Sequence, residues 1–145
     1  MGLDAVVYKH RSHLTLGSEL KDALSDDRTG EVYLADDTLS KRYPRSFFIA
    51  LHKRLGNLEM ISTLRSELEV IVGHKNTDIQ QKWLYSAFHA GDVVPLKNLA
   101  ELEKEIDTIK QKSRGNKSSE IEAFLENLTE LIVAARKENN PIVFI

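Results

Sequence analysis

Leu3–Tyr8 (LDAVVY) and Pro141–Ile145 (PIVFI), at opposite ends of the chain, are the stretches that decide the fold. Both are rich in the β-branched and aromatic residues that suit the pleated surface of a β-sheet. Neither can bury itself alone, because an isolated pair of short strands is only marginally stable in water. We therefore expect both stretches to lie in one common sheet, so that residues 1–145 form a single globular domain. The direction in which the two strands pair stays open.

The middle of the chain, between these strands, has the periodicity of helices. Apolar residues recur every three or four positions in three segments, which places them on one buried face of each predicted helix. These segments run from Leu58 to Val72, from Leu99 to Ile109 and from Ile121 to Ala135.

Two helix starts carry the pattern of a capping box, in which two side chains bond the free amides of the first turn. Thr77 with Gln80 is the first and opens a helix that we expect to reach Phe88. Ser119 with Glu122 is the second and opens the last helix of the chain.

Three shorter elements are expected before Leu58: a helix starting near Ser18, a strand over Glu31–Leu34 (EVYL), and a helix from Pro44 to about Leu55. Proline suits a first helical turn, where its missing N–H has no partner to lose. The whole pattern predicts an α+β fold that is mostly helical. Its small sheet is formed by the N-terminal strand, Glu31–Leu34 and the C-terminal strand, with helices on one side.

The composition excludes several classes of protein. No stretch approaches the roughly 18 apolar residues of a membrane helix, so we expect no membrane partner. No basic segment followed by an apolar one opens the chain, which leads us to expect a cytoplasmic protein. Cysteine is absent, which excludes disulfides and thiolate chemistry. The formal net charge of −2 provides no overall attraction to nucleic acid.

Motifs of catalysis are missing as well. No two of the five histidines stand four residues apart, as in a helical zinc site. The serines lack a nucleophile elbow, and the seven glycines form neither a phosphate loop nor a dinucleotide fingerprint. We therefore expect no metal, no cofactor, no catalytic residue and no enzymatic activity.

Carboxylates cluster between residues 26 and 37, and this group is the more useful signal. Such a group creates a local negative field that attracts a basic partner, although aspartates are also ordinary turn residues. The basic and aromatic stretch Lys41–Arg45 follows closely, but the upstream carboxylates oppose nucleic-acid binding. We expect the partner to be another protein, contacted through Asp26, Asp27, Tyr33, Asp36, Asp37 and Tyr43.

An alternative interpretation is a small enzyme or a small-ligand domain with a pocket formed by Asp4, His52, Tyr85, His89 and Asp92. Asp4 interrupts an apolar strand, and burying its carboxylate without a partner would be costly. It is equally compatible with an exposed strand face or a hydrogen-bonded structural aspartate. His89 also suits the C-terminal end of a helix, where an imidazolium is favoured. The pocket requires the five side chains to lie within about 12 Å.

A third interpretation is a homodimer. If PIVFI lies at the edge of the sheet, its unpaired backbone is prone to pair with a second copy of the chain.

Five segments together carry a resemblance: MGLDAVVY, GEVYLADD, LHKRLGNL, LYSAFHAGDVVP and NPIVFI. The chain resembles small uncharacterised bacterial and phage-associated proteins that open with Met-Gly-Leu-Asp and a strand. More loosely, it is similar to the single-domain immunity proteins that neutralise bacterial toxins. The resemblance implies an interaction protein of immunity or antitoxin type, without a catalytic residue. Together with the acidic group, it leads us to expect a module that occludes a basic toxin domain.

Overall fold

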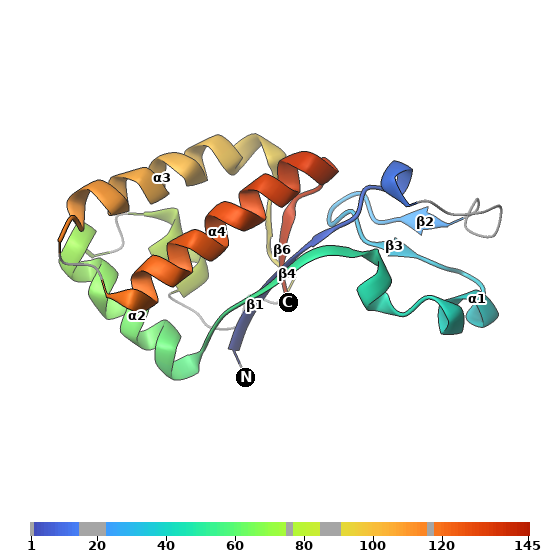
Figure 1. Ribbon diagram of the computed structural model, residues 1–145, viewed down its shortest axis with the longest axis horizontal. Helices are drawn as coiled ribbons and strands as arrows, with labels where there is room; N and C mark the ends of the chain where they lie inside the picture. The colour runs from blue at the N-terminus through green and yellow to red at the C-terminus, as the bar shows by residue number, and fades with distance from the viewer. Residues whose placement is uncertain (1, 15–22, 75–76, 85–90, 116–117) are drawn as a thin grey trace.

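The computed structural model describes residues 2–14, 23–74, 77–84, 91–115 and 118–145 (Figure 1). The fold is α+β, with a four-stranded antiparallel sheet in the order β4-β1-β6-β5. The two terminal stretches pair directly, with Val6 opposite Val143, which confirms the prediction of a common sheet and makes the pairing antiparallel. The strands are β1 (Gly2–Tyr8), β4 (Ile49–Asn57), β5 (Val93–Val94) and β6 (Ile142–Phe144).

The condition of the homodimer interpretation, that PIVFI lies at a sheet edge, is not met. β6 lies between β1 and β5, and Val93 of β5 pairs with Val143 of β6. The backbone of β6 therefore has a neighbour on both sides, and this strand does not offer the pairing edge on which the homodimer interpretation was based.

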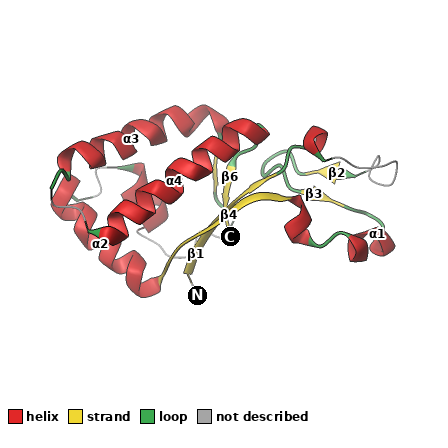
Figure 2. Cartoon of the chain, viewed as in Figure 1, coloured by secondary structure: helices red, strands yellow, loops and turns green. Residues whose placement is uncertain are grey.

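Three long helices cover one face of the sheet, as Figure 2 shows on the left of the molecule. Their bounds are α2 (Leu58–Val72), α3 (Leu99–Lys112) and α4 (Ser119–Glu138), close to the segments expected from apolar periodicity. The strand side chains that point to the helices, such as Ala5 and Val7 of β1, are fully buried in one apolar core with them. None of the described helices is both long and apolar enough to cross a membrane.

A separate lobe is inserted between two adjacent strands of the sheet. The chain leaves β1 at Tyr8, forms the lobe from Lys9 to Phe48 and returns as β4; Lys9 N donates to Phe48 O at 2.8 Å where the lobe begins and ends. We call this segment the lobe and the rest of the molecule the body (Figure 1). The lobe contains the 3-10 turns Arg11–His13 and Arg45–Phe48, β2 (Leu24–Ser25), β3 (Val32–Tyr33) and α1 (Asp37–Arg42).

The strand predicted at Glu31–Leu34 forms as β3, but it does not join the terminal strands. β3 pairs with β2 in a two-stranded sheet of its own. Both sides of β1 are already occupied, by β4 and by β6, so the main sheet has no place for β3 beside the N-terminal strand. The helix predicted near Ser18 lies outside the described residues.

The prediction of a helix from Pro44 to about Leu55 is wrong. Pro44 precedes the turn Arg45–Phe48, and the nine-residue strand β4 follows. The alternation of apolar and polar residues that indicates a strand is interrupted at Lys53. This residue lies between Leu51 and Leu55 on the side of β4 that faces the helices. Lys53 forms an ion pair with Glu130 of α4, so a charged residue occupies a position that pattern analysis expects to be apolar.

The two predicted capping boxes have different outcomes. Thr77 and Gln80 form theirs, since the backbone amide of each donates to the other side chain at 3.1 Å. The residues that follow form a short helix with π-type hydrogen bonds, Ile79–Leu84, and the segment expected to continue to Phe88 lies outside the described residues. At α4 the prediction is one residue late, because the Oγ of Ser118, not Ser119, accepts from Ile121 N.

Candidate functional site

The residues expected to bind a partner all lie on the lobe. Two occupy the turn between β2 and β3, one is on β3, and three lie at the start and just after the end of α1 (Figure 1). In this order they are Asp26 and Asp27, then Tyr33, then Asp36, Asp37 and Tyr43.

The outer face of the β2–β3 hairpin carries an exposed apolar pair. Leu24 and Tyr33 are direct cross-strand partners, so their side chains stand next to each other. Leu24 is 48% exposed and Tyr33 is 49% exposed. Val32, on the opposite face of the hairpin, is buried against Phe48 in the lobe core. Leu24 was not predicted as a contact residue, because only the register of the hairpin reveals its position beside Tyr33.

Two of the four aspartates stabilise local turns. Asp26 Oδ1 accepts from the backbone amides of Thr29 at 2.8 Å and Arg28 at 2.9 Å, and these bonds, that of Thr29 first, lower the pKa of the Asp26 carboxyl. Asp36 Oδ1 accepts from Thr38 N at 2.8 Å and thereby caps α1. These contacts match the ordinary turn role of aspartate.

The other two aspartates differ. Asp27 and Asp37 are exposed, and the carboxylate of neither has a hydrogen-bond or ion-pair partner within the part of the chain that the structure describes. Tyr43, in contrast, is half-buried and packs on Phe47, with 5.1 Å between ring centroids. The exposed candidates of the lobe without a local structural role are therefore Tyr33, Asp27 and Asp37, and Leu24 lies beside Tyr33.

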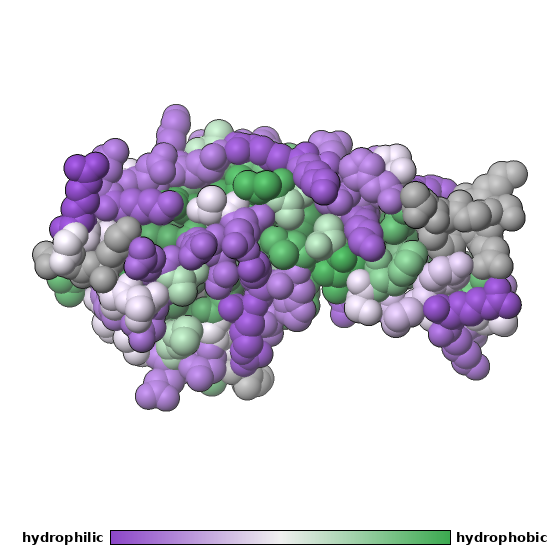
Figure 3. Space-filling view, in the orientation of Figure 1, coloured by the Kyte–Doolittle hydropathy of each residue, from purple (hydrophilic) through white to green (hydrophobic). Residues whose placement is uncertain are grey.

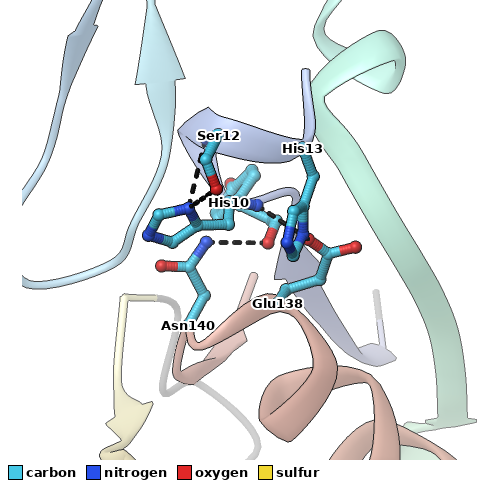
Figure 4. Close-up of polar contacts among 6 residues, drawn as sticks. His10, Ser12, His13, Glu138 and Asn140 are labelled. Atoms are coloured by element: carbon cyan, nitrogen blue, oxygen red, sulfur yellow. Dashed lines mark hydrogen bonds and ion pairs between the residues drawn. The ribbon is translucent and has the colours of Figure 1, made fainter. Parts of the chain in front are cut away.

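The lobe is attached to the body by a buried carboxylate, shown in Figure 4. Glu138, at the end of α4, accepts from His10 N at 2.9 Å and from His13 Nδ1 at 2.5 Å. Burial alone would raise the pKa of Glu138, but the bonds from His10 and His13 outweigh it and hold that pKa below its ordinary value. Glu138 therefore remains an anion that binds the segment leaving β1.

Further polar contacts fix the lobe at other points. Gly30 of the lobe lies directly against the side chain of Asn140, which is itself fixed within the body because its Nδ2 donates to Tyr8 O at 2.8 Å. Arg45 donates to the hydroxyl of Tyr8 at 2.8 Å, and Arg28 donates to Gly91 O at 2.7 Å. The hairpin that carries the exposed pair is thus held in a defined position on the body.

The residues of the alternative pocket are only partly placed. Asp4 meets His52 at 3.5 Å and Arg54 at 3.3 Å, on the sheet face away from the helices, so its carboxylate is paired. Asp92 precedes β5, at the opposite edge of the sheet from β4. Tyr85 and His89 lie outside the described residues, and the shared pocket stays a prediction.

Known proteins add no assignment. Comparison with family models, with curated proteins and with solved structures gives no match to this chain. Within the described ranges, no group of three or more His, Asp or Glu side chains is placed to hold a metal ion. The function is therefore argued from the surface of the lobe.

Proposed function

We propose that this protein is a protein-binding module of immunity or antitoxin type, which acts in the cytoplasm. Its lobe inserts into a basic cleft of a toxin domain and blocks it. The observation that carries the proposal is the exposed pair Leu24 and Tyr33, on the same lobe as the carboxylates of Asp27 and Asp37, which have no partner among the described residues.

The parts of this surface have complementary roles in binding. Tyrosine is enriched among the residues that dominate binding energy, because it buries a large rigid surface and keeps a polar end. Carboxylates on the same lobe attract a basic partner and mainly raise the rate of association. Because polar bonds already hold the hairpin against the body, little conformational freedom is lost on binding.

The anchor is tested by co-purification with the product of the neighbouring gene. The double variant Leu24→Ser/Tyr33→Ala should weaken binding about tenfold or more, as expected for loss of a central anchor. Val70→Ser is the matched control, because Val70 is 86% exposed on α2 of the body. Undiminished binding by the double variant, or no captured partner at all, would count against the proposal.

The charges are tested by association kinetics with the same partner. Asp27→Asn/Asp37→Asn should slow association and reduce its dependence on salt, while dissociation changes little. Light scattering of the isolated protein tests for a stable homodimer. A homodimer that covers the hairpin would contradict the proposal, because a second copy of the chain would then occupy the surface proposed for the partner.

A further inference from the structure

A groove on the body runs along the outer face of α4. It has a volume of about 550 Å³, and Figure 3 shows that this side of the molecule is mostly hydrophilic, with hydrophobic residues between the polar ones. We infer that this groove docks a basic amphipathic helix of a partner protein, a role that is independent of the lobe. The groove is lined by Lys110 of α3 and by Glu122, Leu125, Glu126, Thr129 and Glu130 of α4.

The acidic wall of the groove has helical regularity. Glu122, Glu126 and Glu130 are four residues apart, so their carboxylates follow one side of α4 at intervals of about 6 Å. Beside them, Leu125 and Thr129 form the floor. Val133, one turn beyond Thr129, is 63% exposed and extends the same face with an apolar side chain.

Two of these carboxylates are available to a partner. Glu130 is paired with Lys53 of β4. Glu122 and Glu126 are exposed and have no ion-pair or side-chain hydrogen-bond partner in the described part of the chain. Lys110 is the one cation among the residues that line the groove.

The charge of the groove selects its occupant. A second copy of this chain would place glutamates against glutamates, and nucleic acid would place phosphates against them, so both are disfavoured. A helix with lysine or arginine at positions i and i+4 matches the spacing of Glu122 and Glu126. Apolar side chains on the same face of that helix would contact the exposed Val133 and the methyl group of Thr129, since Leu125 below them is only 1% exposed.

This surface is separate from the lobe. Glu138, which binds the lobe, is twelve residues beyond Glu126 on the same helix, a distance of about 18 Å. Figure 1 accordingly shows the beginning of α4 at the end of the molecule that is remote from β2 and β3. A negative binding result at one surface therefore does not contradict the proposal for the other surface.

The test uses a synthetic, fluorescein-labelled helical peptide with lysines at i, i+4 and i+8 and leucines beside them. A control peptide has the same composition with its lysines spread around the helix. Binding is followed by fluorescence anisotropy, and the contacts are mapped by amide shifts of the ¹⁵N-labelled protein. We expect shifts over residues 122–133 and weaker binding of the control peptide.

Glu122→Gln/Glu126→Gln should weaken binding of the helical peptide about fivefold or more. The control variant Glu59→Gln/Glu101→Gln removes the same charge from exposed positions outside the groove and should bind as the wild type does. Leu24→Ser/Tyr33→Ala should also bind normally, because it changes the lobe only. Equal affinity for both peptides, shifts away from α4, or an equal loss in the control variant would overturn the inference.

Discussion

The body and the lobe are stabilised in different ways. In the body, three helices and the inner face of the sheet share one continuous apolar core. The described core of the lobe has four buried apolar residues, Leu14, Ala23, Val32 and Phe48. The lobe adds to this small core its polar bonds to Tyr8, Gly91 and Glu138 of the body and the close packing of Gly30 on Asn140.

This difference suggests how a small protein can present a binding surface. The four buried residues in the described part of the lobe supply little hydrophobic stabilisation, and bonds to the body add to it. Regions with few buried contacts open more easily than the core, and binding segments are commonly found there. The exposed pair Leu24 and Tyr33 lies on such a region, but contacts with the body hold its hairpin in place.

The largest expected effect comes from replacing one buried phenylalanine in each region. Phe144→Ala empties a buried site in the body core and should reduce the free energy of unfolding by about 3–5 kcal/mol in urea titrations. Phe48→Ala should instead remove amide protection in the lobe first, measured by hydrogen exchange, while α2 and α4 stay protected. Uniform loss of protection in both variants would mean that body and lobe unfold as one unit.

The next effect concerns the contact between lobe and body at Gly30. Gly30 has φ of 75°, and a Cβ placed there would lie 2.3 Å from Asn140 Oδ1. Gly30→Ala should therefore cost about 2–3 kcal/mol, from backbone strain and from displacement of Asn140. Gly115→Ala is the matched control, since Gly115 has φ of 80° with nothing within 4 Å of the added Cβ. Equal costs in urea unfolding would show that the Asn140 contact does not matter.

A smaller effect depends on pH. Because the folded pKa of Glu138 is below its ordinary value of 4.5, its contribution to stability is present above pH 4.5 and is lost as the pH falls through the folded pKa. Glu138→Gln should cost about 1.5 kcal/mol at pH 7, the typical value of hydrogen bonds to a charged group. The cost should shrink as the pH falls below 4.5 in urea titrations. A cost that is constant over this range would contradict the role of the anion.

The smallest expected effect lies wholly within the body. Ser118→Ala removes the N-cap of α4 and should cost about 1 kcal/mol in thermal or urea unfolding, without any change in lobe protection. Ser119→Ala is the control, because Ser119 is the first helical residue and does not provide the cap. A larger cost for Ser119→Ala than for Ser118→Ala would instead make Ser119 the N-cap, as the capping-box pattern predicted.

Several local features could be predicted from the sequence because their cause is local. Helix periodicity located α2, α3 and α4, and the pair Thr77 and Gln80 forms within four residues. The segment Ile49–Asn57 could not be assigned in this way. Its alternation is broken by Lys53, and only the ion pair with Glu130, far along the chain, explains a charge at an inward position.

The proposed contact residues on the lobe show the same limit. Asp27, Asp37 and Tyr33 were predicted from charge and residue type, and the structure places them on the exposed part of the lobe. Leu24 gave no signal, because an isolated leucine is ordinary at any surface. Its position next to Tyr33 depends on the register of a two-stranded sheet.

The sequence by itself determined that both ends of the chain form strands of one sheet and that amphipathic helices cover it, because apolar spacing reflects which side chains must leave water. The tertiary structure decided which strand pairs with which, since β1 has two sides and both were filled by segments distant in sequence. It also decided that Glu138 is buried as an anion. A buried charge is tolerated only where partners meet it, and here His10 and His13 come from the other end of the chain.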